Sequence, residues 1–402
     1  MTMTMNLEPK DPGIWSHGLE LEVRIDRLSD LPDYILEHIL SLAALDSKTL
    51  VQTSILSKRW RCLWKGVPAL NFSRTSFKAE WSFTDHVLMY LSLRCHSIAV
   101  GSIAFNFGSI TCERVRCMEM FDHVMQYATA AHGGQLHHLS ISCAGGKGRL
   151  SPLVASITRC PVYESLKVLK LKGFCLDTAA LSSVGFKLLT TLELHHCRLS
   201  DYPTVHPLAN LPACLNYLKL NGCTAQCWFR ISSPQLLVLE IRSLPFSGGV
   251  EVFAPKLKSF SLWCSMEDIK YIRQLNFPSL AHANIRLWGQ DRHDWKDVTV
   301  LECFSCAYIN LLRGLHHVES LILGFDKSKS EIPWGDRQLP FSRMKPLTTK
   351  SWKASPFPRL KSLRVLYPRE LSKLPLQVFR YFFRSSSINT EEMTVKFEWQ
   401  SE

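Results

Sequence analysis

The sequence of 402 residues lacks several features of membrane and secreted proteins. It contains no uninterrupted apolar stretch of about 18 residues, the length that a membrane-spanning helix needs. The opening segment MTMTMNLEPKDPGIW has no basic start followed by an apolar run, so we expect no secretory signal. The 14 cysteines would then stay reduced, and many would act as small core residues. We therefore expect an intracellular protein of the nucleus, the cytoplasm or both.

Motifs of common catalytic sites are also missing. The sequence has no G-x-S-x-G nucleophile elbow, no H-E-x-x-H metal motif and no dinucleotide-binding fingerprint. The segment AGGKGR at 144–149 resembles part of a phosphate-binding loop, but Ile141 stands where that loop needs its first glycine. We interpret the segment as a turn. These absences favour a protein that is not an enzyme and needs no cofactor.

Cysteine and histidine pairs occur, but their spacing does not predict a metal site. Cys303 and Cys306 form a lone C-x-x-C within an apolar segment, whereas structural zinc usually needs a second pair at a suitable distance. Histidine doublets stand at 137–138, 195–196 and 316–317. Where a doublet lies in a strand, its two side chains point to opposite faces and cannot share a metal. We therefore predict no metal.

Basic residues outnumber acidic ones, and the excess is concentrated near the C-terminus. The chain has 47 Lys and Arg against 35 Asp and Glu, a net charge of +12. Between Pro340 and Ser385 there are eleven basic residues and a single acid, Glu370. No recognisable nucleic-acid-reading element accompanies them, so the segment does not predict a nucleic-acid-binding domain. A solvated surface and a surface for an acidic or phosphorylated protein both remain open.

Residues 28–64 contain three short segments with apolar residues at helical spacing. Pro32 suits the first turn of the first helix, and Asp46 and Ser57 are candidate N-caps of the second and third. Three helices of this length cannot bury all their large side chains against one another. Some of those side chains should therefore remain exposed for a partner.

Behind these helices the pattern L-x-x-L-x-L recurs, mostly every 21–26 residues, a spacing typical of leucine-rich repeats. Each copy predicts one strand of a parallel sheet, whose pattern residues point into the core and whose intervening residues face the concave side. Cys175, Cys197 and Cys223 close their segments and are interpreted as structural. We expect about eight to ten repeats. Clear copies begin at Leu166, Leu189, Leu215, Leu236, Leu257 and Leu280, and weaker ones at Val100, Leu136, Val318 and Leu360.

The intervening positions define a candidate surface for binding a protein target. It combines charges of both signs with an aromatic side chain, as protein-binding surfaces do. Trp263 and Arg242 are the first candidates, because Trp and Arg contribute most to interface energetics. The candidate target-binding residues are Lys170, Glu193, His195, Lys219, Glu240, Arg242, Trp263 and Arg286.

The segment LSDLPDYILEHILSLAALDSKTLVQTSILSKRWRCLWKGVPALNF closely resembles the F-box, including its Leu-Pro start, its SILSKRWRCLW helix and the strand ALNF. The resemblance implies a module that docks on the SKP adaptor of a cullin–RING ubiquitin ligase. Some of the matching residues must instead hold the module together. Carried over by position, the implied adaptor-binding residues are Leu31, Pro32, Ile35, Leu36, Ile39, Val51, Ile55, Leu56, Trp60, Leu63 and Trp64.

An F-box followed by irregular leucine-rich repeats resembles the F-box/LRR proteins of plants. This resemblance implies a substrate receptor of an SCF-type ligase, whose F-box holds the adaptor while the repeats hold a protein for ubiquitination. Other subunits would then catalyse the transfer. Many such proteins also carry a C-terminal FBD region, which the tail of this chain matches poorly. A scaffold that acts outside a ligase and a small-molecule co-receptor remain alternatives.

The predicted fold is an α/β repeat: a three-helix F-box followed by a leucine-rich-repeat solenoid, a horseshoe with a parallel β-sheet. Two long gaps in the pattern, 286–317 and 324–359, are interpreted as insertions, the first with an apolar helix and the second an exposed loop. The expected organisation is a flexible segment at 1–24, the F-box at 25–70, the repeats at 71–385 and a C-terminal tail at 386–402.

Overall fold

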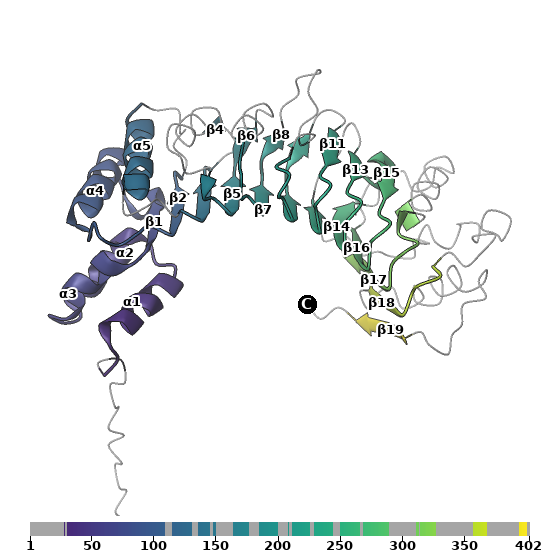
Figure 1. Cartoon of the computed structure of the whole chain (residues 1–402), viewed down its shortest axis with the longest axis horizontal. Coiled ribbons are helices and arrows are strands. Elements are labelled where there is room, and N and C mark those ends of the chain that lie inside the picture. Colours follow the sequence, from purple (N-terminus) through teal and green to yellow (C-terminus); the bar gives the residue numbers. More distant parts are fainter. Residues whose placement is uncertain are drawn as a thin grey trace, which may run out of the picture.

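The computed structural model places a group of helices at one end of a curved array of strands (Figure 1). The expected flexible segment at 1–24 and most of both predicted insertions lie outside the residues that the structure describes. Those residues are 28, 30–108, 115–130, 136–144, 148–149, 164–176, 185–199, 208, 211–225, 229–243, 250–265, 268–288, 311–312, 314–326, 357–367 and 394–399.

The three predicted N-terminal helices are present: α1 spans Asp33–Leu42, α2 Ser47–Gln52 and α3 Trp60–Leu63. The predicted cap of α2 is confirmed, because the Asp46 carboxylate accepts a hydrogen bond of 3.0 Å from the Thr49 backbone N–H. The caps of the other two helices differ from expectation. Pro32 precedes α1 as its N-cap instead of opening the first turn. Ser57 does not cap α3, because its backbone carbonyl, rather than its hydroxyl, bonds to Trp60 N–H at 3.1 Å.

Two longer helices, α4 (Glu80–Leu93) and α5 (Val115–Ala130), follow and were not predicted. They pack on the first strands of the main sheet through a cluster of rings, in which Phe105 lies 5.8 Å from Phe83 of α4 and 5.7 Å from Phe121 of α5. The apolar residues of α4 occur on both its buried and its exposed sides. The helical period is therefore blurred in the sequence, which explains why the pattern did not reveal it.

In the part of the chain that the structure describes, twelve parallel strands form the main sheet, in the order β1-β2-β3-β5-β7-β9-β12-β14-β16-β17-β18-β19. They run as an arc from the helices to β19 (Figure 1). The predicted parallel sheet is confirmed, and each of the ten copies of the leucine pattern contributes one strand. The strands are β1 Ala69–Ser73, β2 Ser102–Asn106, β3 His138–Ser142, β5 Val168–Lys172, β7 Thr191–His195, β9 Tyr217–Asn221, β12 Val238–Arg242, β14 Ser259–Ser265, β16 His282–Trp288, β17 Ser320–Asp326, β18 Ser362–Tyr367 and β19 Thr394–Trp399.

The main sheet extends beyond the ten copies of the leucine pattern at both ends. In the described part of the chain, β1, which contains the predicted F-box strand ALNF, precedes the first copy, and β19 follows the last. Strand β19 pairs in parallel with β18, so the sheet continues past residue 385 into the predicted tail. Its sequence TVKFEW does not carry the L-x-x-L-x-L pattern, which is why it was not recognised.

Alternate residues are buried in the main strands from β1 to β16, so the pattern leucines there form a continuous core behind the sheet, as predicted. Shorter strands behind the main ones form two smaller sheets, ordered β10-β8-β6-β4 and β11-β13-β15. The structural interpretation of two cysteines is confirmed: the buried thiols of Cys197 and Cys223 contact the carbonyls of Leu171 and Leu194 at 3.5 and 3.3 Å. Cys175 is only partly buried. The smaller strands are Gly148–Arg149 (β4), Phe174–Leu176 (β6), Arg198–Leu199 (β8), Thr224–Ala225 (β10), Phe229–Ser232 (β11), Val250–Phe253 (β13) and Ile272–Asn276 (β15).

A buried arginine joins the N-terminal helices to the sheet. Arg94, at the C-terminus of α4, is only 2% exposed. Its guanidinium donates to the carbonyls of Val67 and Ile98, at 2.9 and 2.8 Å, and to the Tyr127 hydroxyl of α5 at 3.1 Å. Trp64 lies 5.0 Å from the Tyr90 ring at the same junction. The helices and the first strands therefore form one packed unit.

A second contact at this junction predicts that the stability of the protein depends on pH. The His86 ring of α4 lies 2.9 Å from the Ser47 hydroxyl of α2 and 4.9 Å from the Phe77 ring. Burial lowers the pKa of His86, and its effect exceeds the opposing charge of Asp46. The unfolded chain therefore binds a proton more readily, and the stabilisation present at neutral pH is lost as the pH falls below the ordinary histidine pKa of about 6.5.

We expect His86→Phe to weaken the dependence of stability on pH, because phenylalanine keeps a ring beside Phe77 and cannot bind a proton. The free energy of unfolding would be measured by urea denaturation between about pH 7 and pH 5. The wild type should lose more stability over this interval than the variant. If the free energies of unfolding of the two proteins changed equally with pH, His86 would not contribute to the pH dependence.

Candidate functional site

Three of the predicted adaptor-binding residues lie in the core and not on the surface. Leu36, Leu63 and Trp64 are 0%, 3% and 5% exposed. All three belong to the hydrophobic cluster that joins the N-terminal helices to α4 and β1. Their assignment as adaptor contacts is corrected: in this fold they hold the module together and leave no surface for a partner.

The other predicted adaptor-binding residues reach the surface to different extents. Ile55 and Leu56 are the most open, at 84% and 65% exposed, and Ile39 is 38% exposed. These side chains leave large apolar surfaces in water, as an unoccupied interface does. Pro32 is also exposed, whereas the half-buried residues are Leu31, Ile35, Val51 and Trp60.

An ion pair fixes the start of α1 beside the turn before α3. The Arg59 Nε lies 2.6 Å from an Asp33 carboxylate oxygen, and the same guanidinium donates to the Leu31 carbonyl. These contacts hold the start of α1, which follows Pro32, against the turn that precedes α3.

Sequence reasoning missed three exposed apolar residues of the same helical module. Tyr34 and Leu42 of α1 are 68% and 72% exposed, and Leu28 is 51% exposed. Tyr34 and Leu42 lie outside the apolar stripe of α1 that the spacing picked out. Helical periodicity identifies the buried face of a helix, so it says little about apolar residues displayed on the opposite face.

The structure brings all eight predicted target-binding residues to one face of the main sheet. Lys170, Glu193, Lys219 and Glu240 occupy one row, where each residue is paired in register with the next. A second row contains His195, Arg242, Trp263 and Arg286, with Asn221 between the first two. All of these residues are partly exposed, because alternate positions of each strand point away from the core.

Two acids of this face, Glu193 and Glu240, form ion pairs with neighbouring side chains. Glu193 lies 3.0 Å from Lys170 Nζ and 3.2 Å from His195 Nε2. Burial alone would raise the pKa of Glu193, but the hydrogen bonds from Lys170 and His195 outweigh burial and lower it. The carboxylate therefore stays charged at neutral pH and is bound within the sheet.

Glu240 is held in the same way from three sides. It lies 3.1 Å from Arg242 and 3.8 Å from Lys219, and it accepts a hydrogen bond of 2.9 Å from the Tyr217 hydroxyl. Burial and this hydrogen bond raise the pKa of Tyr217, so the phenol stays protonated. Glu193 and Glu240 are thus paired with neighbouring side chains, and in the two rows around them the four Lys and Arg residues outnumber the two acids, which leaves an excess of positive charge.

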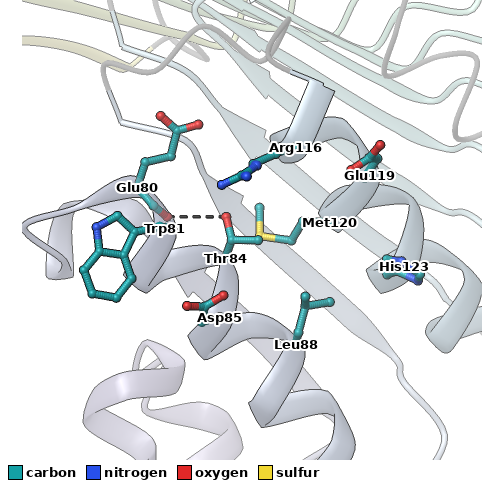
Figure 2. Close-up of a pocket in the computed structure, with 9 residues that line it drawn as sticks. All are labelled: Glu80, Trp81, Thr84, Asp85, Leu88, Arg116, Glu119, Met120 and His123. Carbon is teal, nitrogen blue, oxygen red and sulfur yellow. Dashed lines mark hydrogen bonds between the residues drawn. The ribbon is translucent and has the colours of Figure 1, made fainter.

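A groove lies between α4 and α5 (Figure 2). Its volume is about 760 Å³, and Trp81, 64% exposed, lies at one end. The Thr84 hydroxyl donates to the Glu80 carbonyl at 3.3 Å within it. None of the predicted site residues lines this groove, and its polar residues do not form a metal site. Its lining residues are Glu80, Trp81, Thr84, Asp85, Leu88, Arg116, Glu119, Met120 and His123.

The part of the chain that the structure describes holds no group of three or more His, Cys, Asp or Glu side chains placed to bind a metal. Cys303 and Cys306 lie outside that part, as do residues 145–147 of the AGGKGR segment. The His137 ring contacts the Ser165 carbonyl at 3.2 Å, a structural role. Among the described helices, none is long and apolar enough to cross a membrane.

Comparison with known proteins identifies the N-terminal module. Residues 28–72 match the F-box domain family, which covers α1 to α3 and most of β1. A putative F-box/LRR-repeat protein of Arabidopsis thaliana is 26% identical over 362 residues, covering 84% of this chain and 69% of the relative. An F-box/FBD/LRR-repeat protein of the same plant is 30% identical over 281 residues, covering 67% of this chain and 58% of the relative.

A further putative F-box/LRR-repeat protein of Arabidopsis thaliana is 28% identical over 324 residues, covering 77% of this chain and 62% of the relative. The chain thus spans less than two thirds of the length of the second and third of these relatives. Residues 28–72 are therefore an F-box domain, and the chain as a whole is similar to F-box/LRR-repeat proteins of Arabidopsis thaliana.

Proposed function

We propose that this chain is the substrate-receptor subunit of an SCF-type cullin–RING ubiquitin ligase. Its F-box docks on the SKP-type adaptor, and the concave face of the main sheet binds a protein target for ubiquitination. F-box proteins usually serve in this way as non-catalytic subunits, and this role suits a protein of the nucleus or cytoplasm. The main support is the F-box surface, where Ile55 and Leu56 are exposed to water beside a rigid core.

The energetics of this surface are sufficient for stable docking. Complete burial of one Leu or Ile side chain contributes about 1.5–3 kcal/mol. Ile55 and Leu56 are almost fully available for such burial, and Ile39 and Leu42 add further apolar area. Ordering these exposed side chains on docking costs part of this gain in conformational entropy.

The rigid connection between the two surfaces supports a receptor role. Arg94 and the cluster around Trp64 fix the F-box to the first strands, and the sheet continues in unbroken register toward β19. A target held on the concave face would therefore keep a defined position relative to the adaptor. The chain would accelerate ubiquitination by raising the effective concentration of target lysines near the enzyme that carries ubiquitin.

Assembly from purified components tests this proposal. The full chain would be mixed with a plant SKP-type adaptor and a cullin, and the mass of the product measured by size-exclusion chromatography with light scattering. We expect a complex with one copy of each protein. Association with the adaptor but not with cullin would favour a scaffold outside the ligase. Absence of any association at micromolar concentration would contradict the proposal.

A further inference from the structure

One group of side chains on the concave face has features of a binding site for an anion. Arg242, Trp263 and Arg286 stand side by side on the adjacent strands β12, β14 and β16, in register. The guanidinium carbons of Arg242 and Arg286 lie 4.0 and 4.8 Å from the centre of the Trp263 ring. Each neighbouring strand thus contributes one cation to the same indole.

The two cations are held close together without a matching number of acids. Both lie against one ring, so their guanidinium carbons are within about 9 Å of each other and repel. Arg242 contacts Glu240, which Lys219 and Tyr217 also contact. Among the side chains that the structure describes, Arg286 has no carboxylate partner. An anion that binds beside it would remove the repulsion.

Several polar atoms of this group have no hydrogen-bond partner in the described part of the chain. They are Trp263 Nε1, the Nε atoms of Arg242 and Arg286, and Asn284 Oδ1. Three of the four are N–H donors, and buried donors without acceptors destabilise a protein unless a ligand satisfies them. The arrangement therefore favours a ligand with several acceptor oxygens, such as a carboxylate or a phosphate.

The neighbouring strand leaves room for Arg286. Gly324 of β17 is its partner in register. A Cβ atom at Gly324 would lie 2.8 Å from Arg286 Cγ, closer than van der Waals contact allows. Glycine at this position thus leaves space for the Arg286 side chain, and any larger residue would require that side chain to shift.

We infer that Arg242, Trp263 and Arg286 form the centre of target recognition and bind an acidic side chain or a phosphate group on a peptide segment of the target. This inference rests on the proposed function, in which the concave face binds a protein. A carboxylate and a phosphate are both compact anions whose oxygens lie close together. Arg286 binds it by charge-assisted hydrogen bonds, and the indole N–H of Trp263 supplies a further donor.

Binding of peptide pools to the adaptor complex of the full chain tests the inference. Four fluorescent pools of equal length would be compared by polarisation: one rich in Asp and Glu, one with phosphoserine, one neutral with Gln and Ser, and one basic. We expect at least a tenfold preference for one of the anionic pools over the neutral pool. The preferred pool identifies a carboxylate or a phosphate as the recognised group.

Two variants and a control connect the preference to these residues. Arg286→Gln removes the cation for which the described side chains provide no acid partner, and it should abolish most of the preference, as should Trp263→Leu. The matched control is Arg198→Gln, which removes the positive charge of the exposed residue of β8 and should change binding less than twofold. An equal preference in Arg286→Gln and the wild type would overturn the inference, as would binding of a DNA strand equal to that of the anionic peptides.

Adaptor capture, measured on the same samples, separates this inference from the proposed function. Arg286→Gln should bind the adaptor as the wild type does, because the substitution lies on the concave face. If the wild type binds the adaptor but prefers no anionic pool, the inference fails and the proposed function stands. If the wild type does not bind the adaptor, the proposed function fails instead.

Discussion

Replacing Ile55 and Leu56 together by Asp is expected to reduce adaptor affinity at least about 100-fold while the protein stays folded. The two side chains are 84% and 65% exposed, so they contribute little to the core of the free chain. On docking, their burial should contribute about 3 kcal/mol or more in total, and a buried, unpaired carboxylate opposes docking further. Each 1.4 kcal/mol changes a binding constant tenfold.

Titration calorimetry with the purified adaptor measures this effect, and thermal unfolding of the free variant checks the fold. Phe253→Asp is the matched control, because Phe253 is also exposed, at 47%, but lies in β13 of the solenoid. The control should bind the adaptor like the wild type. Wild-type affinity in the Ile55 and Leu56 variant would show that the adaptor uses another surface.

Arg94→Ala is expected to lower the free energy of unfolding by about 3 kcal/mol or more, the largest loss of stability that we predict for one residue. The guanidinium is buried and donates to two carbonyls and one hydroxyl from different elements. Hydrogen bonds to a charged group contribute about 1.5–3 kcal/mol each, and alanine would leave the buried carbonyls unsatisfied.

Urea denaturation of the wild type and the variant would provide the comparison. Arg198→Ala serves as the control, because an exposed arginine of a surface strand should change the stability by less than about 0.5 kcal/mol. A loss below about 1 kcal/mol for Arg94→Ala would mean that the junction between the helices and the sheet is stabilised mainly by its aromatic cluster.

The repeat strands could be predicted from the sequence because burial in them follows a fixed period. Leu169, Leu192 and Leu218 occupy equivalent positions in adjacent strands, and each is buried. Strand β19 was missed because its sequence departs from the leucine pattern. Helices α4 and α5 were missed for another reason: they cover the end of the sheet, and the exposed Trp81 and Leu88 interrupt the amphipathic pattern of α4.

The candidate site could be predicted in position but not in detail. Strand alternation placed Arg242, Trp263 and Arg286 on one face, whereas their stacking depends on distances that a linear pattern does not contain. The F-box shows the same limit. Leu36 and Ile39 both fit its motif, but only packing against the following helices reveals that Leu36 is completely buried. Contacts between distant segments decide which motif residues remain for a partner.

Hydrogen–deuterium exchange of the full chain with and without the adaptor tests whether the adaptor binds the F-box and leaves the concave face of the main sheet free. We predict that the adaptor slows exchange in α1 and around Ile55 and Leu56, and leaves the strands β9 to β16 unchanged. The concave face would then remain free for a target. Slower exchange in those strands, with no change in the F-box, would contradict the account.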